Sequence, residues 1–219
     1  MRASGVLSKA EELLRASGVQ SVLYDKIPPN PTVSAVDEGA RLAVTEKCDV
    51  VVGLGGGSAM DSAKGIALVA VSGGSVWEYT IVEDPELRKP KGALPVVAVP
   101  TTSGTGSEVN PVSMVTADET KLKTGVVSSH VLPVAALVDP KLTVTMPPRV
   151  TASTGIDAFF HAVESYTSTG SNPLTETFVE KAIRLIGKAQ IWRLDTTWLW
   201  PACWLEWPTA TLARRFSTG

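Results

Sequence analysis

The chain has 219 residues, of which 44% are hydrophobic, and a formal net charge of −2. This length fits one large domain or two small ones with a real core. The near-neutral charge and the absence of Lys/Arg runs exclude an electrostatic basis for binding nucleic acid or an anionic membrane surface, so neither partner is expected. Two cysteines outside any motif, no signal-peptide pattern and no apolar run of roughly 18 residues predict a cytoplasmic protein.

The first elements alternate between helix and strand patterns. Apolar residues at helical spacing predict an amphipathic helix over Val6–Ser17, and Ser21–Tyr24 predicts a short strand. Thr32 is expected to cap a helix that runs to Glu46. The chain therefore opens on a helix, whereas an α/β domain usually begins with a strand.

The stretch Asp49–Ala70 organises the first half of the chain. Val50–Leu54 predicts a strand buried on both faces, and a triple-glycine turn then leads into a helix in which Ser58 is expected to cap and Asp61 to lie in the first turn. Glycines lack the Cβ atoms that would keep a ligand away from the backbone, and the start of a helix presents free N–H groups to an anion. The turn therefore favours binding of a phosphate or pyrophosphate. A purely structural turn remains the alternative. Neither common phosphate fingerprint fits, because Ser58 replaces the third glycine of one and no Ser or Thr follows Lys64 for the other.

A second loop of similar chemistry follows the next predicted strand. Leu94–Val99 reads as a buried strand and ends in Pro100–Glu108, a loop rich in hydroxyls and glycines that suits ribose and phosphate oxygens. Ligands of open α/β sheets bind where the carboxyl ends of strands converge, so the two loops together favour a nucleotide. Further strands are predicted at Val112–Thr116 and Lys123–Val127, as a hairpin, and at Ala135–Val138.

Beyond Pro147 the pattern becomes helical, with predicted helices over Thr151–Tyr166 and Leu174–Lys188. In the first of these, Asp157, His161 and Glu164 share one face. Asp157 and His161 stand one turn apart, a spacing that lets a carboxylate and an imidazole chelate one divalent ion. An Asp–His hydrogen bond or exposed polar residues are the alternatives.

Two other readings of the polar residues are weaker. His130 is interpreted as structural. A serine hydrolase built on Ser103 or Ser107 is disfavoured because no G-x-S-x-G elbow is present.

With both sites in view, the chain resembles the iron-containing (group III) alcohol dehydrogenase family. Six collinear stretches carry the resemblance, in the family's order and spacing: Pro29–Thr32, Gly55–Lys64, Pro100–Glu108, Asp139-Pro140, Met146–Pro148 and Thr154–Glu164. The resemblance implies a Rossmann-like, parallel-sheet nucleotide-binding domain over residues 1–146 and the beginning of an all-α metal-binding domain over residues 147–189. An atypical Trp-rich tail covers residues 190–219 and holds five of the six tryptophans.

The resemblance also implies roles for individual residues. A nicotinamide cofactor, NAD or NADP, would be held by Asn30, Gly56, Gly57, Ser58, Asp61, Thr101, Thr102, Thr105 and Lys123. Asp157 and His161 would bind Fe2+ or another divalent metal such as Zn2+, and no catalytic residue beyond the metal ligands is implied. The metal would act as a Lewis acid on the oxygen of a small alcohol or aldehyde substrate.

The sequence departs from the family pattern in three places. Family members begin with a strand and an acidic residue that precede the first helix of this chain. They also carry two further metal-binding histidines, whereas no histidine follows His161 here. The resemblance ends near Ala189, which suggests that a reading-frame slip or gene truncation replaced the native helical domain.

We interpret the chain as an incomplete, NAD(P)-dependent and metal-dependent alcohol dehydrogenase with impaired activity. The alternative is a nucleotide-binding fragment without catalysis. Whether the chain forms a homo-oligomer is left open by the sequence.

Overall fold

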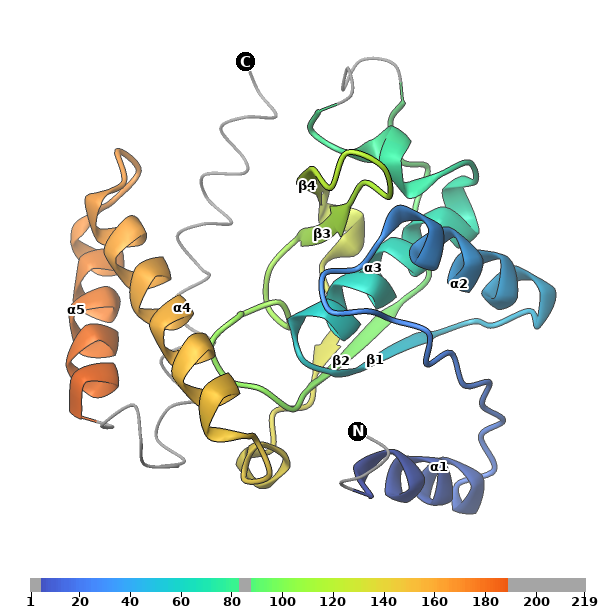
Figure 1. The fold of residues 1–219 in the computed structure, drawn as a ribbon, viewed down its shortest axis with the longest axis horizontal. Helices are drawn as coiled ribbons and strands as arrows, with labels where there is room; N and C mark the ends of the chain where they lie inside the picture. The colour runs from blue at the N-terminus through green and yellow to red at the C-terminus, as the bar shows by residue number, and fades with distance from the viewer. Residues whose placement is uncertain (1–4, 83–87, 189–219) are drawn as a thin grey trace.

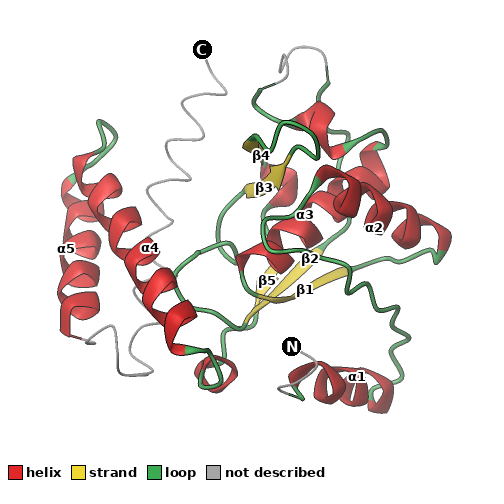
Figure 2. Ribbon diagram, viewed as in Figure 1, coloured by secondary structure: helices red, strands yellow, loops and turns green. Residues whose placement is uncertain are grey.

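The fold is an α/β arrangement around a parallel sheet, as predicted. The computed structural model describes residues 5–82 and 88–188. Three parallel strands pair in the order β1-β2-β5 and comprise Val51–Gly55, Val96–Pro100 and Ala135–Ala136. Figure 2 shows these three strands side by side next to α3. Because β1 and β2 are parallel neighbours, the loops that follow them emerge at the same edge of the sheet.

Helix α3 (Gly57–Ser72) lies directly on β1 and β2, and α2 (Val33–Thr45) packs against α3 (Figure 1). Gly53 permits the close approach of strand and helix. A Cβ atom at Gly53 would lie 3.0 Å from both the Met60 Cα and the Ala63 Cβ. The glycine therefore lets α3 sit low enough on the sheet to bring its first turn beside the strand ends.

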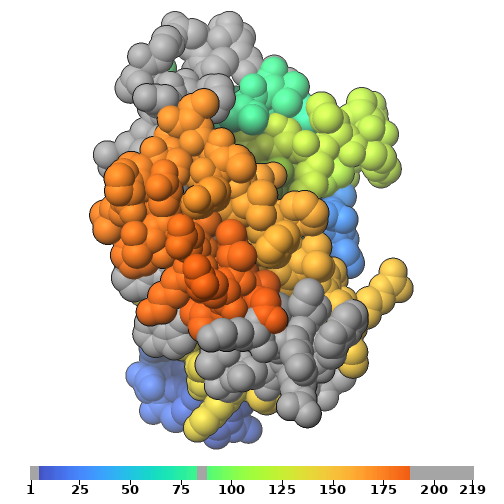
Figure 3. Space-filling view, turned by 90° about the vertical axis from the view of Figure 1, so that its left-hand side faces the viewer, coloured from blue at the N-terminus to red at the C-terminus, as the bar shows by residue number. Residues whose placement is uncertain are grey.

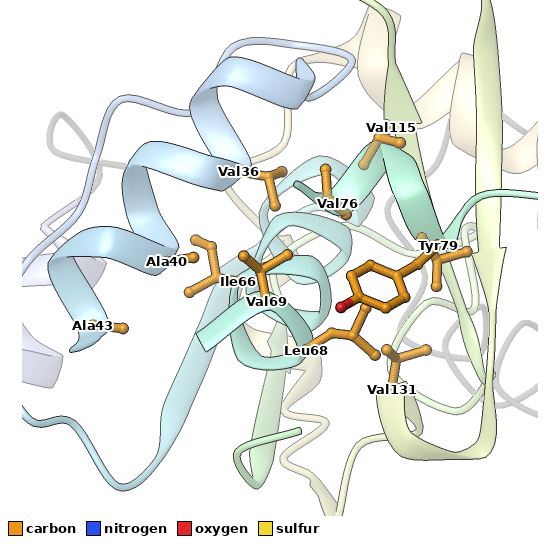
Figure 4. Packing of buried hydrophobic residues seen from close by; sticks show 11 residues of the cluster. Val36, Ala40, Ala43, Ile66, Leu68, Val69, Val76, Tyr79, Val115 and Val131 are labelled. Atoms are coloured by element: carbon orange, nitrogen blue, oxygen red, sulfur yellow. The ribbon is translucent and has the colours of Figure 1, made fainter. Parts of the chain in front are cut away.

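The main hydrophobic core lies between α2, α3 and the hairpin (Figure 4). It comprises Val36, Ala40, Ala43, Ile66, Leu68, Val69, Val76, Tyr79, Val115, Val126 and Val131. Burying an aliphatic side chain of this size contributes roughly 1.5–3 kcal/mol. This core fixes α3, and α3 in turn carries the glycine turn.

The prediction that β1 is buried on both faces is wrong. Val51 and Gly53 face the helices, but Val52 on the opposite face is 49% exposed and the preceding Val50 is 42% exposed. Among the described residues, helices cover one face of this strand only. The apolar run reflects the composition of both faces, and it cannot show which of them is covered.

The strand predicted at Ser21–Tyr24 is also absent, because residues 19–30 form an extended connection without a ladder partner among the described residues. A strand needs a hydrogen-bonded neighbour, whatever its propensity. Tyr24 instead packs on the core and donates its hydroxyl to the Ala35 carbonyl oxygen at 2.8 Å. The preceding helix α1 (Val6–Ala16) begins at the predicted residue, ends one residue before the predicted Ser17 and has no buried residue (Figure 1).

Of the two predicted helix caps, one is present. Thr32 caps α2, and its hydroxyl accepts from the Ala35 amide at 3.3 Å. Ser58 does not cap α3, which begins two residues earlier than a Ser58 cap implies, at Gly57, with Gly56 as an N-cap that lacks a side-chain hydrogen bond. Asp61 consequently lies beyond the first turn.

The predicted hairpin is confirmed: β3 (Val112–Thr116) and β4 (Lys123–Val127) pair antiparallel beside α3. The predicted strand Ala135–Val138 is shorter, since β5 contains only two residues. Short 3-10 helices lie at Val76–Tyr79 (η2), Ser129–Val131 (η3) and Pro140–Thr143 (η4). His130, interpreted as structural, lies exposed in η3.

The last described elements are α4 (Pro148–Thr167) and α5 (Pro173–Lys188), which pack side by side on one face of the molecule (Figure 3). Ala158 and Ala162 of α4 meet Val179, Ala182 and Ile186 of α5 in a separate small core. No helix in the described part of the chain is long and apolar enough to span a bilayer. The Trp-rich tail at 190–219 lies outside the described residues, and so does the proposed reading-frame slip.

Candidate functional site

A cavity of about 580 Å³ lies where α3, the loop after β2, the hairpin and α4 meet. Its lining comprises Pro31, Gly56, Gly57, Ser58, Asp61, Thr102, Thr105, Ser107, Asn110, Val112, Met114, Lys123, Thr154, Asp157 and His161. Both groups of residues singled out in the sequence thus line one cavity. Of the predicted residues, only Asn30 and Thr101 are outside this lining.

The glycine turn and the second loop form a tight cradle. A Cβ atom at Gly56 would lie 3.1 Å from the Thr102 methyl carbon, and one at Gly57 would lie 3.0 Å from the Thr105 methyl carbon. Side chains at either glycine would therefore fill the space between the two loops. The first turn of α3 has no side-chain cap, so its N-terminus offers amides and a positive dipole end to an anion.

The second loop also carries a polar group, the Thr102 hydroxyl, that suits a phosphate or ribose oxygen. The Thr102 hydroxyl oxygen is buried and makes no hydrogen bond within the described residues. A buried hydroxyl without a partner is costly, and a ligand oxygen would satisfy it. Thr101 instead uses its amide to bond the Gly55 carbonyl oxygen at 2.8 Å, which joins the ends of the two strands. The residues present therefore fit the pyrophosphate and ribose of a dinucleotide.

Asn30, Ser58 and Lys123 form a second side of the cradle. The Asn30 amide donates to the Ser58 hydroxyl at 3.3 Å, and Lys123 donates to the Asn30 side-chain oxygen at 3.2 Å. Asn30 has a φ of 57°, a left-handed conformation that asparagine tolerates better than most residues. Ser58 lies inside α3 and so cannot cap it, and its hydroxyl accepts instead from a residue far away in sequence.

Asp61 lies on the cavity wall in a buried polar network. Its carboxylate accepts a hydrogen bond from the Ser107 hydroxyl at 2.6 Å, and the Lys64 ammonium lies 4.0 Å away. Burial raises the pKa of the Asp61 carboxyl above its ordinary value, and the charge of Lys64 and the Ser107 hydrogen bond oppose that rise. Lys64 and Ser107 therefore favour the ionised form of the Asp61 carboxyl, whereas burial favours its protonated form.

Asp157 and His161, the predicted metal ligands, lie on the α4 side of the cavity. The Asp157 carboxylate and His161 Nε2 are 3.8 Å apart, with their side chains 48% and 26% exposed. Glu164, on the same predicted face, is exposed and does not line the cavity. The described residues contain no group of three or more His, Cys, Asp or Glu side chains that could hold a metal. Asp157 and His161 thus fit two positions of a shell that normally takes at least three protein ligands.

The second loop touches α4 at Gly104. This residue has a φ of 138°, and a Cβ atom there would lie 2.7 Å from the Thr154 backbone carbon and closer still to its carbonyl oxygen. Only a residue without a side chain permits this approach. Gly104 therefore sets how closely the second loop can approach the helix that carries Asp157 and His161.

Sequence reasoning missed several residues of the site. The sequence tests Lys64 as a phosphate-loop lysine and Ser107 as a loop hydroxyl or a hydrolase nucleophile. Thr154 begins a stretch that resembles the family but has no role of its own there, and Asn110 lies in no motif. The Ser107 hydroxyl donates to Asp61 and accepts from Lys64 at 3.0 Å. Ser107 is therefore part of the Lys64–Asp61 network, and because no G-x-S-x-G elbow precedes it, the serine hydrolase stays disfavoured.

Comparison with known proteins defines the class. The sequence profile of the iron-containing alcohol dehydrogenases matches residues 1–140, and that of the C-terminal region of the Fe-containing alcohol dehydrogenase family matches residues 151–193. The chain belongs to the iron-containing alcohol dehydrogenase family. The exact domain boundary at residue 146 stays a prediction.

Individual relatives agree with this assignment. Alcohol dehydrogenase 4 of Schizosaccharomyces pombe is 40% identical over 184 residues, which are 84% of this chain and 43% of that protein. The structure of sulfoacetaldehyde reductase from Bifidobacterium kashiwanohense in complex with NAD+ has a TM-score of 0.82 and 34% identity, covering 93% of this chain and 55% of that one. NADH-dependent butanol dehydrogenase A from Thermotoga maritima has a TM-score of 0.86 and 30% identity, covering 97% and 54%. The chain spans about half the length of the relatives it matches.

Proposed function

We propose that this chain binds NAD or NADP and transfers hydride between the cofactor and a small alcohol or aldehyde, with the help of a divalent metal. One observation carries the proposal: the dinucleotide cradle and the Asp157–His161 pair line the same cavity. A hydride donor and acceptor must lie side by side, and a shared cavity supplies that proximity.

The assignment of cofactor residues follows from the contacts in the cradle. We propose that Gly56, Gly57 and Ser58 bind the pyrophosphate, and that Asp61 and Lys123 bind ribose hydroxyls. Thr102 and Thr105 would contact the nucleoside. Asn30 and Thr101, which lie outside the cavity lining, would support the residues that form it. The NAD+ complex of one relative and the NADH-dependent name of another support a nicotinamide cofactor.

Asp157 and His161 are proposed to hold Fe2+, or Zn2+ in its place, as two of its donors. Because two donors bind a divalent ion weakly, we propose that metal affinity and turnover are low in this chain. A bound ion would lower the pKa of the alcohol hydroxyl as a Lewis acid.

The proposal is tested first by binding. Titration of the purified 219-residue chain with NADH and with NADPH, followed by nucleotide fluorescence, is expected to give saturable binding of at least one of them. Gly57→Ala should weaken it, because the new methyl group would press on Thr105 at the cradle. Gly187→Ala is the matched control, since a Cβ atom at Gly187 has no neighbour within 4 Å. Absence of binding to both nucleotides would overturn the proposal.

Catalysis is tested by NAD(P) reduction with 1-butanol or propanediol and added Fe2+ under anaerobic conditions. Alcohol-dependent reduction that disappears on chelation is expected. Cofactor binding without any reduction would favour the non-catalytic nucleotide-binding alternative. Hydrolysis of an ester substrate that survives chelation and disappears in Ser103→Ala or Ser107→Ala would instead indicate a hydrolase.

A further inference from the structure

Large apolar side chains are exposed along one side of α4. Ile156, Phe159, Phe160 and Tyr166 are each between 37% and 57% exposed. Their spacing places them on one side of the helix, because a turn takes 3.6 residues. The rings of Phe159 and Phe160 contact each other edge to face, with centroids 6.1 Å apart. We call these four residues the apolar face of α4.

The contacts already described for α4 leave this face unused. Ala158 and Ala162 pack against α5, and Asp157 and His161 line the cavity. Within the described helix pair, no residue of the apolar face belongs to the small core or to the cavity lining. Clustered exposed apolar side chains usually mark an interaction site. The apolar face therefore needs an occupant.

The chain itself carries a segment of matching chemistry. The Trp-rich tail, residues 190–219, begins two positions after the last residue of α5, Lys188. Besides five tryptophans it contains six further Ile, Leu or Phe residues and only five charged ones. A buried Trp side chain removes roughly 150–250 Å² of surface from water. Its composition suits an apolar and aromatic surface better than it suits water.

The geometry of the helix pair places this segment within reach. Residues 168–172 join α4 to α5 and the two helices lie side by side, so the end of α5 returns to the first half of α4 (Figure 1). Ile186, near that end, shares the small core with Ala158, the neighbour of Phe159. A helix is about 10–12 Å across, and six residues of extended chain span roughly 20 Å. A few residues of the tail therefore suffice to reach the apolar face.

We propose that the Trp-rich tail covers the apolar face of α4, with its tryptophans packed on Phe159 and Phe160. A second copy of the chain is the competing occupant. The tail is favoured over it because a segment on a short tether has an effective concentration of the order of mM. This inference is independent of the proposed cofactor and metal, so its test contains neither.

Acrylamide quenching of tryptophan fluorescence in the full chain tests the proposal, because five of the six tryptophans lie in the tail. The sixth, Trp77, packs on the main core and contributes equally to every variant. In the folded chain, acrylamide should reach much less of the emission than in the same chain in urea. Phe159→Gln combined with Phe160→Gln should raise quenching toward the value in urea. Gln retains good helix propensity, and circular dichroism confirms that the variant is folded.

Leu13→Gln is the matched control, because Leu13 is about as exposed as Phe160 but lies in α1. It should leave quenching as in the unaltered chain. If the double variant does not fold, Ile156→Gln combined with Tyr166→Gln replaces it, with the same expectation.

Three results would overturn the proposal. In the first, the folded chain is protected from quenching by no more than the roughly one-sixth share of Trp77. In the second, quenching is unchanged in a folded variant of the apolar face, which would mean that the tail does not lie there. In the third, protection is lost on dilution while light scattering shows a dimer becoming a monomer, which would identify a second copy as the occupant.

Discussion

The contact between Gly104 and Thr154 makes a quantitative prediction about stability. In Gly104→Ala, the new methyl group would lie 2.7 Å from the Thr154 backbone carbon, a distance that real Cβ atoms do not show. The clash is with backbone, so no rotamer change can relieve it. Overpacking of this kind costs roughly 1–3 kcal/mol. The φ of 138° adds backbone strain of about 1–3 kcal/mol for a residue with a side chain.

Together these terms predict that Gly104→Ala lowers the free energy of unfolding by roughly 2–6 kcal/mol, a large fraction of the 5–15 kcal/mol typical of a domain. The measurement is urea unfolding followed by circular dichroism. With a slope of about 2 kcal/mol/M, the midpoint should fall by roughly 1–3 M.

Gly92→Ala is the matched control, because Gly92 also has a positive φ, 157°, but its added Cβ atom would meet only Val71 at an ordinary 3.5 Å. It should therefore show the strain without the clash, and a smaller shift of the midpoint. Equal shifts in the two variants, or none in Gly104→Ala, would refute the idea that this contact is a rigid junction between the second loop and α4.

Two further predictions concern single carboxylates. Asp157→Ala should abolish Fe2+ or Zn2+ binding measured by calorimetry and leave NADH binding little changed, whereas Glu164→Ala, exposed on the same helix and outside the cavity lining, should retain both; equal loss of both ligands in Asp157→Ala would contradict the assignment. The Ser34 side chain and amide, which donate to Asp118 at 2.6 and 2.9 Å, hold the pKa of that carboxyl below its ordinary 3.8. A lowered folded-state pKa stabilises the protein above pH 3.8, and this stabilisation disappears as the pH falls through the folded-state value. Asp118 accepts from an amide in the first turn of α2, as a helix cap does, and it is exposed. Asp118→Asn should therefore lower the free energy of unfolding by about 0.5–1 kcal/mol at pH 7, the low end for a cap, and should not change it in strong acid. An equal loss at both pH values, measured by urea unfolding, would exclude this cause.

Local patterns predicted the local features of this protein well. Thr32 caps α2 as expected, because the cap hydrogen bond joins residues three apart in the chain. The glycine turn and the second loop could be placed at one edge of the sheet because parallel neighbouring strands leave no other arrangement. Asp157 and His161 could be placed on one helix face because residues four apart in a helix lie one turn apart.

The features that sequence reasoning missed depend on contacts between distant residues. Ser58 has the identity of a helix cap, but its hydroxyl accepts from Asn30, 28 positions away. Lys64 fails the phosphate-loop pattern, and its buried position depends on acceptors 43 to 48 positions away. Ser21–Tyr24 has the composition of a strand, yet a strand is a property of a pair of segments. No periodicity in a single segment reports such partners.

The bond between Lys123 and Asn30 spans 93 positions of the chain, and it is part of the cradle. A site assembled from such remote segments can form only after most of the domain has reached its native topology. A ligand that recognises it therefore binds the folded state alone and stabilises it. At a concentration of 100 Kd such a ligand adds about 2.7 kcal/mol to the folded state. The cellular nicotinamide pool would then decide how much of this chain persists as native protein, and the melting temperature would rise with each increment of dinucleotide.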